Sequence, residues 1–282
     1  MMKVFVTGAT GYVGSAVVRE LIGAGHTVSG LCRSEEKAAG LKAAGAEAVY
    51  GTLDDLDTLG RAAAAADGVI HLAFTNDFSN FEGALDLDLR AVEVMGAALE
   101  GSGKPFITTA HANGHTVDQA VLAKAEQGVR ASIVSLAPSV HGEGDKGFVP
   151  MMISIARAKG FAAYIGDGMN RWPAVHRLDA AVLYRLALES APAGSRLLGA
   201  GDEGIPFHEI AAVIGRQLKV PTVGITPEEA AAHFGFLGTI AAFDITSLYN
   251  AKQASLETRE LLGWKPMQSG LIADLEEGHY FA

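Results

Sequence analysis

The chain has 282 residues, of which 49% are hydrophobic and 19% are charged, a composition typical of a globular protein rather than a disordered one. The formal net charge of −10 argues against a nucleic-acid groove and against a polybasic membrane surface. The lone cysteine, Cys32, excludes an intrachain disulfide and a multi-cysteine metal site, and it fits a reducing compartment. No apolar run reaches membrane-spanning length, and the first residues do not resemble a signal peptide. We therefore expect a soluble cytoplasmic protein that binds neither nucleic acid nor membrane.

Short β-branched runs alternate with longer Ala- and Leu-rich segments along the first part of the chain. Strands are expected over residues 3–7, 27–31, 46–50, 68–72, 105–109 and 131–136. Helices are expected over residues 12–24, 34–44, an Ala-rich segment after Asp54, 81–100 and 117–127. This alternation predicts an α/β fold with a doubly wound parallel sheet of the Rossmann type, joined by right-handed crossovers.

The first expected strand leads directly into the turn TGATGYVG at residues 7–14, which opens the first expected helix. Its glycines allow a tight turn, close approach of the backbone to a pyrophosphate, and close packing of the helix on the strand. The N-terminus of the helix also favours a phosphate. A dinucleotide is therefore expected to contact Thr7, Gly8, Thr10, Gly11, Tyr12, Val13 and Gly14.

This turn resembles the TGxxGxxG turn of extended and atypical short-chain dehydrogenases/reductases, a superfamily that includes nucleotide-sugar epimerases. HLA at 71–73 is similar to the family's fourth-strand segment beside the cofactor. SLAPSVHG at 135–142 is similar to its RPxxVYG turn, with Ser135 in place of arginine, and AVHRLDAA at 174–181 is similar to its HVDDxA segment. The resemblance implies an NAD(P)-dependent enzyme with further cofactor contacts at Leu72, Ala73, Phe74, Pro138 and Val140.

The residue pattern changes after about residue 145, where aromatic residues, prolines and single polar residues become more frequent. Residues 1–145 are therefore expected to form the NAD(P)-binding Rossmann domain. Residues 146–282 are expected to form a smaller C-terminal substrate-binding lobe, with residues 176–200 returning to the Rossmann sheet.

The residues after the second expected strand bear on the choice of cofactor. An acidic residue there accepts the ribose hydroxyls of NAD, whereas an arginine accommodates the 2′-phosphate of NADP. This chain has no acid at the strand end; it has Arg33, and Lys37 one helical turn later, which resembles the RxxxK pattern of NADP-preferring atypical members. The alternative is a pair of solvated surface cations. NADP is expected, with NAD the less favoured cofactor, and Thr52 and Leu53 fall where the family has Asp-Leu beside adenine.

The resemblance also implies a catalytic tyrosine, a lysine four residues later, and a serine or threonine that polarises a carbonyl. Thr108 and Thr109 end the fifth expected strand, where the hydroxyl residue belongs. When DQAVL at 118–122 is matched to the family's EQAVL, Ala110 falls at the tyrosine position and Gly114 at the lysine position. The pair is absent, and the connection over residues 110–115 is much shorter than usual. Either this member has lost the loop, or the sequence omits a stretch.

Other side chains are candidates for the proton donor. His111 and His115 lie near the expected active site, and histidine is the side chain most often used as a general acid or base. Their H-x-x-x-H spacing also suits metal ligands, but without an HExxH glutamate or a cysteine pair no metal is expected. Tyr164, from the second lobe, is a third candidate. A capping box of Thr116 and Gln119 is expected at the start of the helix that follows.

The segment GDGMNRWPAVHR at 166–177 places polar residues beside aromatic ones, as a small-molecule pocket requires. The expected substrate-binding residues are His141, Asn170, Trp172 and His176. The alternative is a rigid loop anchored by its tryptophan. The arginines of this segment suit either a diphosphate or a structural role.

Together these patterns favour an NAD(P)-dependent oxidoreductase, a carbonyl reductase or dehydrogenase acting on a small-molecule carbonyl or alcohol. The alternative from another class is an NADP-binding sensor or scaffold without turnover, which the missing tyrosine and lysine favour. A sugar-nucleotide epimerase or dehydratase ranks lower. A homodimer is expected through the helices over residues 81–100 and 117–127.

Overall fold

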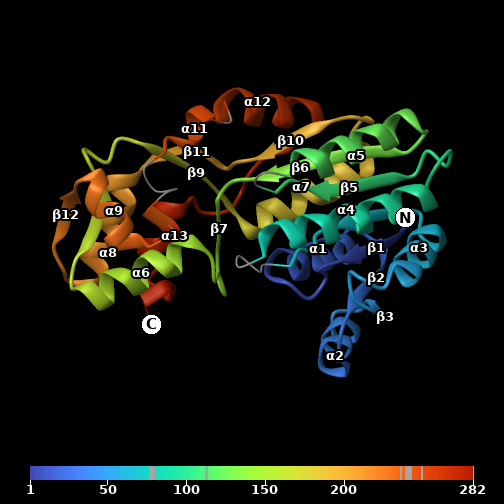
Figure 1. Ribbon diagram of the computed structural model, residues 1–282. Helices are drawn as coiled ribbons and strands as arrows, with labels where there is room; N and C mark the ends of the chain where they lie inside the picture. Colours follow the sequence, from blue (N-terminus) through green and yellow to red (C-terminus); the bar gives the residue numbers. More distant parts are fainter. Residues whose placement is uncertain (76–79, 112–113, 236, 239–242, 249, 282) are drawn as a thin grey trace. The chain divides into compact units, whose positions relative to one another are not determined.

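The computed structural model describes residues 1–75, 80–111, 114–235, 237–238, 243–248 and 250–281 (Figure 1). Internal contacts divide the chain into two compact units, each with its own hydrophobic core. Unit 1 comprises Met1–Ser135, Ala180–Leu197 and Leu261–Trp264. Unit 2 comprises Leu136–Asp179, Leu198–Glu260 and Lys265–Ala282.

Unit 1 is built on a seven-stranded sheet of order β10-β6-β5-β4-β1-β2-β3. The strands are β1 (Lys3–Thr7), β2 (Thr27–Cys32), β3 (Glu47–Tyr50), β4 (Gly68–His71), β5 (Pro105–Thr109), β6 (Arg130–Leu136) and β10 (Arg196–Gly199). Strands β1 to β6 are parallel, with register pairs such as Val4↔Val28 and Val69↔Phe106. The order 3-2-1-4-5-6 is that of the doubly wound Rossmann sheet, so the predicted fold class is confirmed.

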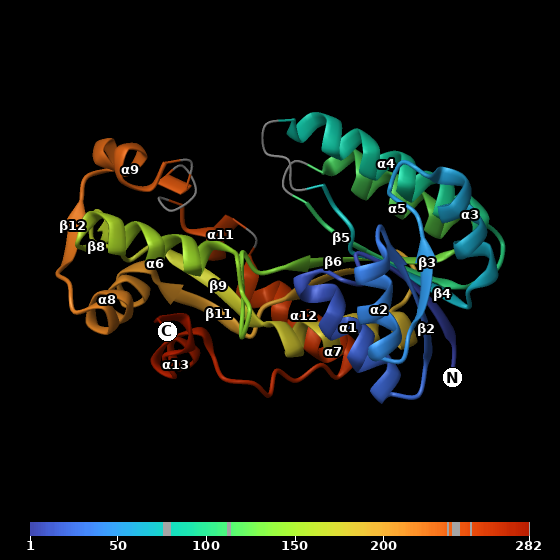
Figure 2. The same ribbon diagram turned by 90° about the horizontal axis from the view of Figure 1, so that it is seen from below.

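Helices cover both faces of this sheet (Figure 2). The helices are α1 (Tyr12–Gly23), α2 (Glu35–Ala43), α3 (Leu56–Ala65), α4 (Phe81–Ala98), α5 (His115–Glu126) and α7 (Arg177–Ser190). Figure 2 shows α3, α4 and α5 on one face, and α1, α2 and α7 on the other. On the α4 side the core contains the fully buried side chains of Phe5, Met95 and Phe106.

The start of α5 corrects one prediction. The helix begins at His115 with Gly114 as its N-cap, and no side chain caps it. The capping box of Thr116 and Gln119 was therefore wrong, because Thr116 already lies inside the first helical turn, where its hydroxyl is not at the cap position.

Unit 2 contains a three-stranded sheet of order β11-β9-β7 and a parallel two-stranded sheet of β12 and β8. Its strands are β7 (Ser139–His141), β8 (Ala162–Ile165), β9 (Arg171–His176), β11 (Asp202–Pro206) and β12 (Thr222–Ile225). Its helices are α6 (Phe148–Lys159), α8 (Phe207–Leu218), α9 (Pro227–Phe234), α11 (Ile245–Leu248), α12 (Ala251–Leu262), α13 (Leu271–Glu276) and the 3₁₀ helix η1 (His279–Phe281). Trp172 is the largest buried side chain of its core, with Phe148 and Phe207 edge-on to the indole ring.

Among the residues that the structure describes, no helix combines the length and the apolar character needed to cross a bilayer.

Candidate active site

The glycine turn lies at the carboxyl end of β1, the edge at which open α/β sheets bind their ligands. Gly8 has φ of +65°, and a Cβ there would lie 2.8 Å from backbone atoms of both Leu72 and Ala73. A Cβ on Gly14 would overlap the carbonyl oxygen of Gly8. Gly11 is different: it is exposed, and a Cβ there would approach only that same oxygen, at 3.1 Å. Two glycines are thus required by the fold itself, and Gly11 leaves room on the outer side of the turn.

A buried hydrogen-bond network holds the turn against the loop after β4. The hydroxyl of Thr7 accepts bonds from the backbone N–H groups of Leu72 and Ala73, both at 3.2 Å. Both lone pairs of this oxygen are then in use, so its proton points to Nδ1 of His71, 2.6 Å away. The His71 ring therefore carries its own proton on Nε2, which donates to Oδ1 of Asp88 at 2.8 Å. Three of the predicted cofactor residues, Thr7, Leu72 and Ala73, belong to this network.

The order hydroxyl, imidazole, carboxylate is also that of a hydrolytic triad. Thr7 is fully buried, however, and its oxygen is saturated by two N–H donors. It has no lone pair for attack on a substrate. The network is structural.

His111 lies at the carboxyl edge of β5, beside this network. Its ring stacks on Phe74 with centroids 3.9 Å apart, and its Nε2 lies 3.9 Å from Oδ2 of Asp88. Burial lowers the pKa of His111 below its usual value, and the Asp88 carboxylate partly opposes that shift. An imidazole with a lowered pKa and a restricted orientation at this edge is suited to accept and return a proton.

The two threonines at the end of β5 point in different directions, as successive strand residues do. Thr108 is buried. The hydroxyl of Thr109 donates to the His71 carbonyl oxygen at 3.3 Å and accepts from the hydroxyl of Tyr184 at 2.7 Å. Tyr184, on α7, is fully buried, and burial raises its pKa far above the usual value. Tyr184 was not among the predicted site residues, and its one signal in the sequence was its place in the segment expected to return to the Rossmann sheet.

The remaining proton-donor candidates lie elsewhere. His115 is exposed at the first residue of α5, and Ala112 and Asn113 of the shortened connection lie outside the described residues. Tyr164 is on β8 in unit 2, half-buried, with its ring 6.3 Å from that of His208. Neither His111 nor His115 belongs to a group of three metal-ligating side chains within the described part of the chain.

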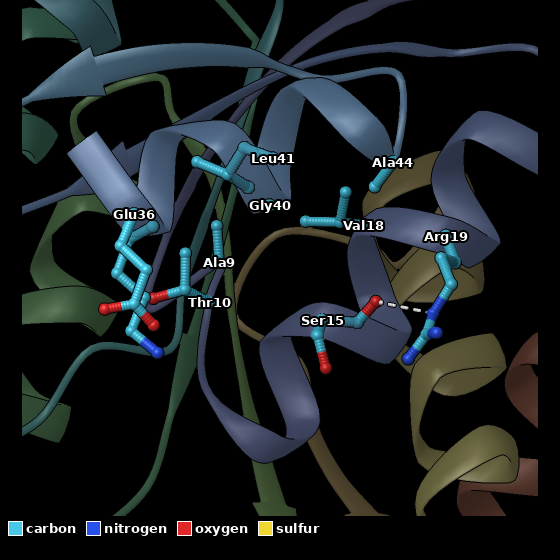
Figure 3. A pocket seen from close by; sticks show the side chains of 10 residues that line it. Ala9, Thr10, Ser15, Val18, Arg19, Glu36, Gly40, Leu41 and Ala44 are labelled. Atoms are coloured by element: carbon cyan, nitrogen blue, oxygen red, sulfur yellow. Dashed lines mark hydrogen bonds between the residues drawn. The ribbon is translucent and has the colours of Figure 1, made fainter. Parts of the chain in front are cut away.

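A cavity of about 300 Å³ separates α1 from α2, next to the glycine turn (Figure 3). Its lining consists of Ala9, Thr10, Ser15, Val18, Arg19, Glu36, Lys37, Gly40, Leu41 and Ala44. Figure 3 shows Thr10 and Glu36 at one end of this cavity and Arg19 at the other. Two predicted cofactor residues, Thr10 and Lys37, thus line the same cavity.

Arg33 follows the last residue of β2 and is exposed. Its guanidinium has no hydrogen-bond or ion-pair partner among the described residues. Ser34 caps α2, since its hydroxyl accepts from the Lys37 N–H at 3.3 Å. After β3, the hydroxyl of Thr52 donates to Oδ1 of Asp54 at 2.5 Å, and this bond lowers the Asp54 pKa. A carboxylate therefore lies beside Thr52, and it is supplied by Asp54, two residues later in the chain.

The predicted substrate-binding residues and the predicted cofactor contacts Pro138 and Val140 lie on or beside two paired strands of unit 2. Val140 and His141 are on β7, preceded by Pro138, and Trp172 and His176 are on the paired strand β9. Asn170 precedes β9 and donates from Nδ2 to the Phe243 carbonyl oxygen at 3.3 Å.

The arginines beside these residues are bound to the backbone of unit 2. Nη1 of Arg171 donates to the Gly204 carbonyl oxygen at 3.0 Å. Nη1 of Arg177 donates to the Glu143 carbonyl oxygen at 2.8 Å. These bonds favour the structural role for both guanidinium groups.

Comparisons with known proteins agree with this geometry. Residues 4–97 match the NAD dependent epimerase/dehydratase family. An uncharacterized protein of Schizosaccharomyces pombe is 47% identical, with 99% of this chain and 100% of the relative covered, and one of Saccharomyces cerevisiae is 43% identical, with 99% of each covered. The alignment with the first spans 301 positions, more than the 282 residues of this chain, so the relative has residues without a counterpart here.

More distant matches include enzymes. A ketoreductase of Stigmatella aurantiaca that acts on a 4-hydroxy-2-methyl-3-oxo-4-farnesyl-3,4-dihydroquinoline-1-oxide is 26% identical over 83% of this chain and 80% of its own. The structure of a dTDP-glucose 4,6-dehydratase from Streptomyces venezuelae with bound NAD has a TM-score of 0.74 at 16% identity, covering 97% of this chain and 95% of its own. With the Rossmann sheet and the glycine turn in place, these matches assign the chain to the NAD dependent epimerase/dehydratase family, a group of extended short-chain dehydrogenase/reductase proteins.

Proposed function

We propose that the protein is an NADPH-dependent carbonyl reductase, or the corresponding dehydrogenase, acting on a small-molecule carbonyl or alcohol. The observation that carries the proposal is the glycine turn. Backbone atoms leave no room for a side chain at Gly8 or Gly14, whereas the exposed Gly11 leaves space for a pyrophosphate. The name of the Stigmatella relative, a ketoreductase, supports reduction of an oxo group. When bound, the nicotinamide supplies or accepts a hydride.

The preference for NADP over NAD rests on charge at the start of α2. Arg33 is exposed and has no ion-pair partner among the described residues, and Lys37 and Thr10 line the same cavity. A guanidinium, an ammonium and a hydroxyl together suit a 2′-phosphate, since charge-assisted hydrogen bonds are about twice as strong as neutral ones. The Asp54 carboxylate beside Thr52 is suited to accept a bond from the adenine amino group.

His111 is the proton donor in this proposal. Its Nε2 faces Asp88, which leaves Nδ1 for the substrate oxygen, and the Phe74 ring fixes the plane of the imidazole. On reduction His111 gives a proton to the carbonyl oxygen, and on oxidation it removes the alcohol proton. Thr109 is less suited to polarise the substrate carbonyl, because its hydroxyl already donates to the backbone carbonyl oxygen of His71.

Titration with both dinucleotides tests the proposed cofactor. The unmodified protein should bind NADPH more tightly than NADH, and Arg33→Asp should weaken NADPH binding about tenfold to a hundredfold. Arg61→Asp is a matched control, because Arg61 is an exposed arginine on α3 outside the cavity lining. Equal affinities for NADPH and NADH in the unmodified protein would refute the assignment.

A second candidate is an NADP-binding sensor without turnover. It is favoured by the residues at the usual catalytic positions, Ala110 and Gly114, and by the internal bonds of the Thr109 hydroxyl. Tight NADPH binding without oxidation of NADPH by any ketone, aldehyde or imine would select this candidate. The epimerase alternative has less support, because Arg171 and Arg177 are bound to backbone carbonyls. For either candidate, the buried free thiol of Cys32 supports a reducing, cytoplasmic location.

A further inference from the structure

Three side chains of the kinds that bind metals gather where α13 ends. They are Asp274 on the helix, Glu277 at its C-cap and His279 in η1, and we call them the carboxylate–histidine cluster. Their ligand atoms all lie within 4.8 Å of one another. Two ligands of one Zn²⁺ ion, each bound at about 2.0–2.2 Å, lie at most about 4.4 Å apart. Nδ1 of His279 and Oδ1 of Asp274 already meet this limit at 3.8 Å, so the cluster is close to ligating geometry.

Asp274 is held in place from the side away from the cluster. The residue is 4% exposed, and its Oδ2 accepts a hydrogen bond at 2.7 Å from Nδ1 of the buried His141 on β7. Its Oδ1 makes no hydrogen bond within the described part of the chain and faces the cluster. Burial of such an oxygen costs free energy unless a partner reaches it. Carboxylates that bind metals are commonly oriented in this way, by a hydrogen bond to one oxygen while the other contacts the ion.

The cluster is open to solvent through its other two members. Glu277 is exposed, and the His279 side chain is 31% exposed. The Ser269 hydroxyl donates to Oε1 of Glu277 at 3.3 Å, and this bond engages only one of the two carboxylate oxygens. The His279 ring lies against the ring of Tyr280, with centroids 4.4 Å apart, and the Tyr280 hydroxyl donates to Oδ2 of Asp145 at 3.0 Å. An ion can therefore reach the cluster from water, and the segment that carries the imidazole is fastened.

The charge of the cluster favours a cation. Among the described residues, neither Asp274 nor Glu277 has a lysine or arginine within ion-pair distance, and Arg216 on α8 is paired with Glu276 instead. The two carboxylates also lie at the C-terminal end of a helix, where the helix dipole is negative. The imidazole then selects among cations. Mg²⁺ and Ca²⁺ prefer oxygen ligands, whereas Zn²⁺ binds both imidazole nitrogen and carboxylate oxygen.

We propose that the carboxylate–histidine cluster is a Zn²⁺ site. Its ligands are Oδ1 of Asp274, one carboxylate oxygen of Glu277 and Nδ1 of His279, with water in the remaining position. The ion joins α13 to η1, and the bond between Asp274 and His141 links it to β7. This site is separate from the H-x-x-x-H pair at the start of α5, and it does not rest on the proposed function.

Titration with metal ions tests the site and the choice of ion. Tag-free protein that has been treated with a chelator is titrated with ZnCl₂, MnCl₂ and MgCl₂ by calorimetry. One Zn²⁺ should bind per chain, at least about tenfold more tightly than Mn²⁺, with Mg²⁺ weaker still, because affinity rises along the divalent series and imidazole disfavours Mg²⁺. The absence of saturable Zn²⁺ binding, or tighter binding of Mn²⁺ or Mg²⁺, would overturn the proposal.

Two pairs of variants locate the ion. His279→Gln should weaken Zn²⁺ binding at least about tenfold, since loss even of an outer partner of a metal ligand costs about 10–100-fold. His115→Gln, at an exposed histidine of unit 1, should leave the affinity unchanged. Glu277→Gln should weaken binding in the same way, whereas Glu276→Gln, at the neighbouring exposed carboxylate, should not. All four positions are exposed, so each variant should fold. Zn²⁺ binding that is the same in all four would be adventitious binding at the surface, and the proposal would fail.

Thermal unfolding gives a second readout that needs neither NADPH nor a substrate. An ion that binds only the folded protein raises its Tm. Free Zn²⁺ at about a hundredfold above its Kd should raise the Tm of the unmodified protein and of His115→Gln by roughly 5–10 °C, and that of His279→Gln much less. An equal rise in His279→Gln would place the stabilising ion elsewhere and contradict the proposal. Because the reductase proposal enters neither readout, its failure and the failure of this site can be told apart.

Discussion

Gly8, Gly11 and Gly14 differ in their surroundings, and this difference separates folding from binding within one turn. Gly11→Val should leave the fold intact, because a Cβ meets only the Gly8 oxygen, at 3.1 Å. The branched side chain should nevertheless block the pyrophosphate and abolish NADPH binding. Gly23→Ala, on the same helix with nothing within 4 Å of its Cβ, is the control. Circular dichroism and NADPH titration test the pair; a folded Gly11→Val variant with normal affinity would show that the turn is purely structural.

The pH profile identifies the proton donor. Burial lowers the pKa of His111 below its ordinary value of about 6.5, so the charged ring is lost as pH rises through that lowered value. The rate of carbonyl reduction should therefore fall as pH increases, with a midpoint below about 6.5, and alcohol oxidation should rise over the same interval.

The matching variant is His111→Gln, which should slow turnover about a hundredfold to ten-thousandfold. His115→Gln, at the exposed first residue of α5, should change it little. Reduction that persists towards pH 10 in the unmodified protein would point to a tyrosine instead.

Single residues were predictable where one local rule decides their place, as with the glycines of the turn and the Ser34 cap. The bonds of Thr109 were not predictable, because Tyr184 reaches it from 75 residues along the chain. The same holds for Thr7, whose partners His71, Leu72 and Ala73 belong to another strand and its loop. Such contacts depend on the packing of the sheet, which hydrophobic periodicity does not encode.

At the scale of elements, the start of α2 links stability to cofactor binding. Ser34→Ala removes the bond to the Lys37 N–H and should lower the free energy of unfolding by about 1 kcal/mol. It should also weaken NADPH binding, because Arg33 and Lys37 flank the cap. Thr226→Ala removes the capping box of α9 in unit 2, and it should cost a similar stability without affecting NADPH. Urea denaturation and NADPH titration of both variants test this link; equal NADPH affinity in the two would contradict it.

The elements of unit 1 were predictable because their periodicity and their glycine stops agree. Gly25 and Gly45, both at positive φ, come directly after the expected helix ends at residues 24 and 44. Unit 2 was harder to predict. Strands of three or four residues such as β7, β8 and β12 are too short for a pattern, and their pairing depends on register with distant segments.

The predicted homodimer depends on the outer faces of α4 and α5. The exposed residues of α4 include Glu82, Asp86, Arg90 and Glu93, whereas α5 exposes Ala123. Light scattering at micromolar concentration should give a dimer mass for the unmodified protein, and Ala123→Glu should give a monomer, because it places a charge in the predicted contact. A monomer mass for the unmodified protein would rule out this assembly.

Hydride transfer between NADPH and a small carbonyl, the reaction proposed for this chain, can be followed with an isotope. NADPH carrying deuterium at C4, with each of the two C4 epimers used in turn, is incubated with the protein and a panel of small ketones and aldehydes, and the products are examined by mass spectrometry. One epimer should deliver deuterium to the former carbonyl carbon with formation of NADP⁺, while the proton on the new hydroxyl comes from the protein or the solvent. Tight binding of NADPH with no deuterium in the product, from any ketone, aldehyde or imine offered, would contradict the account and favour the sensor.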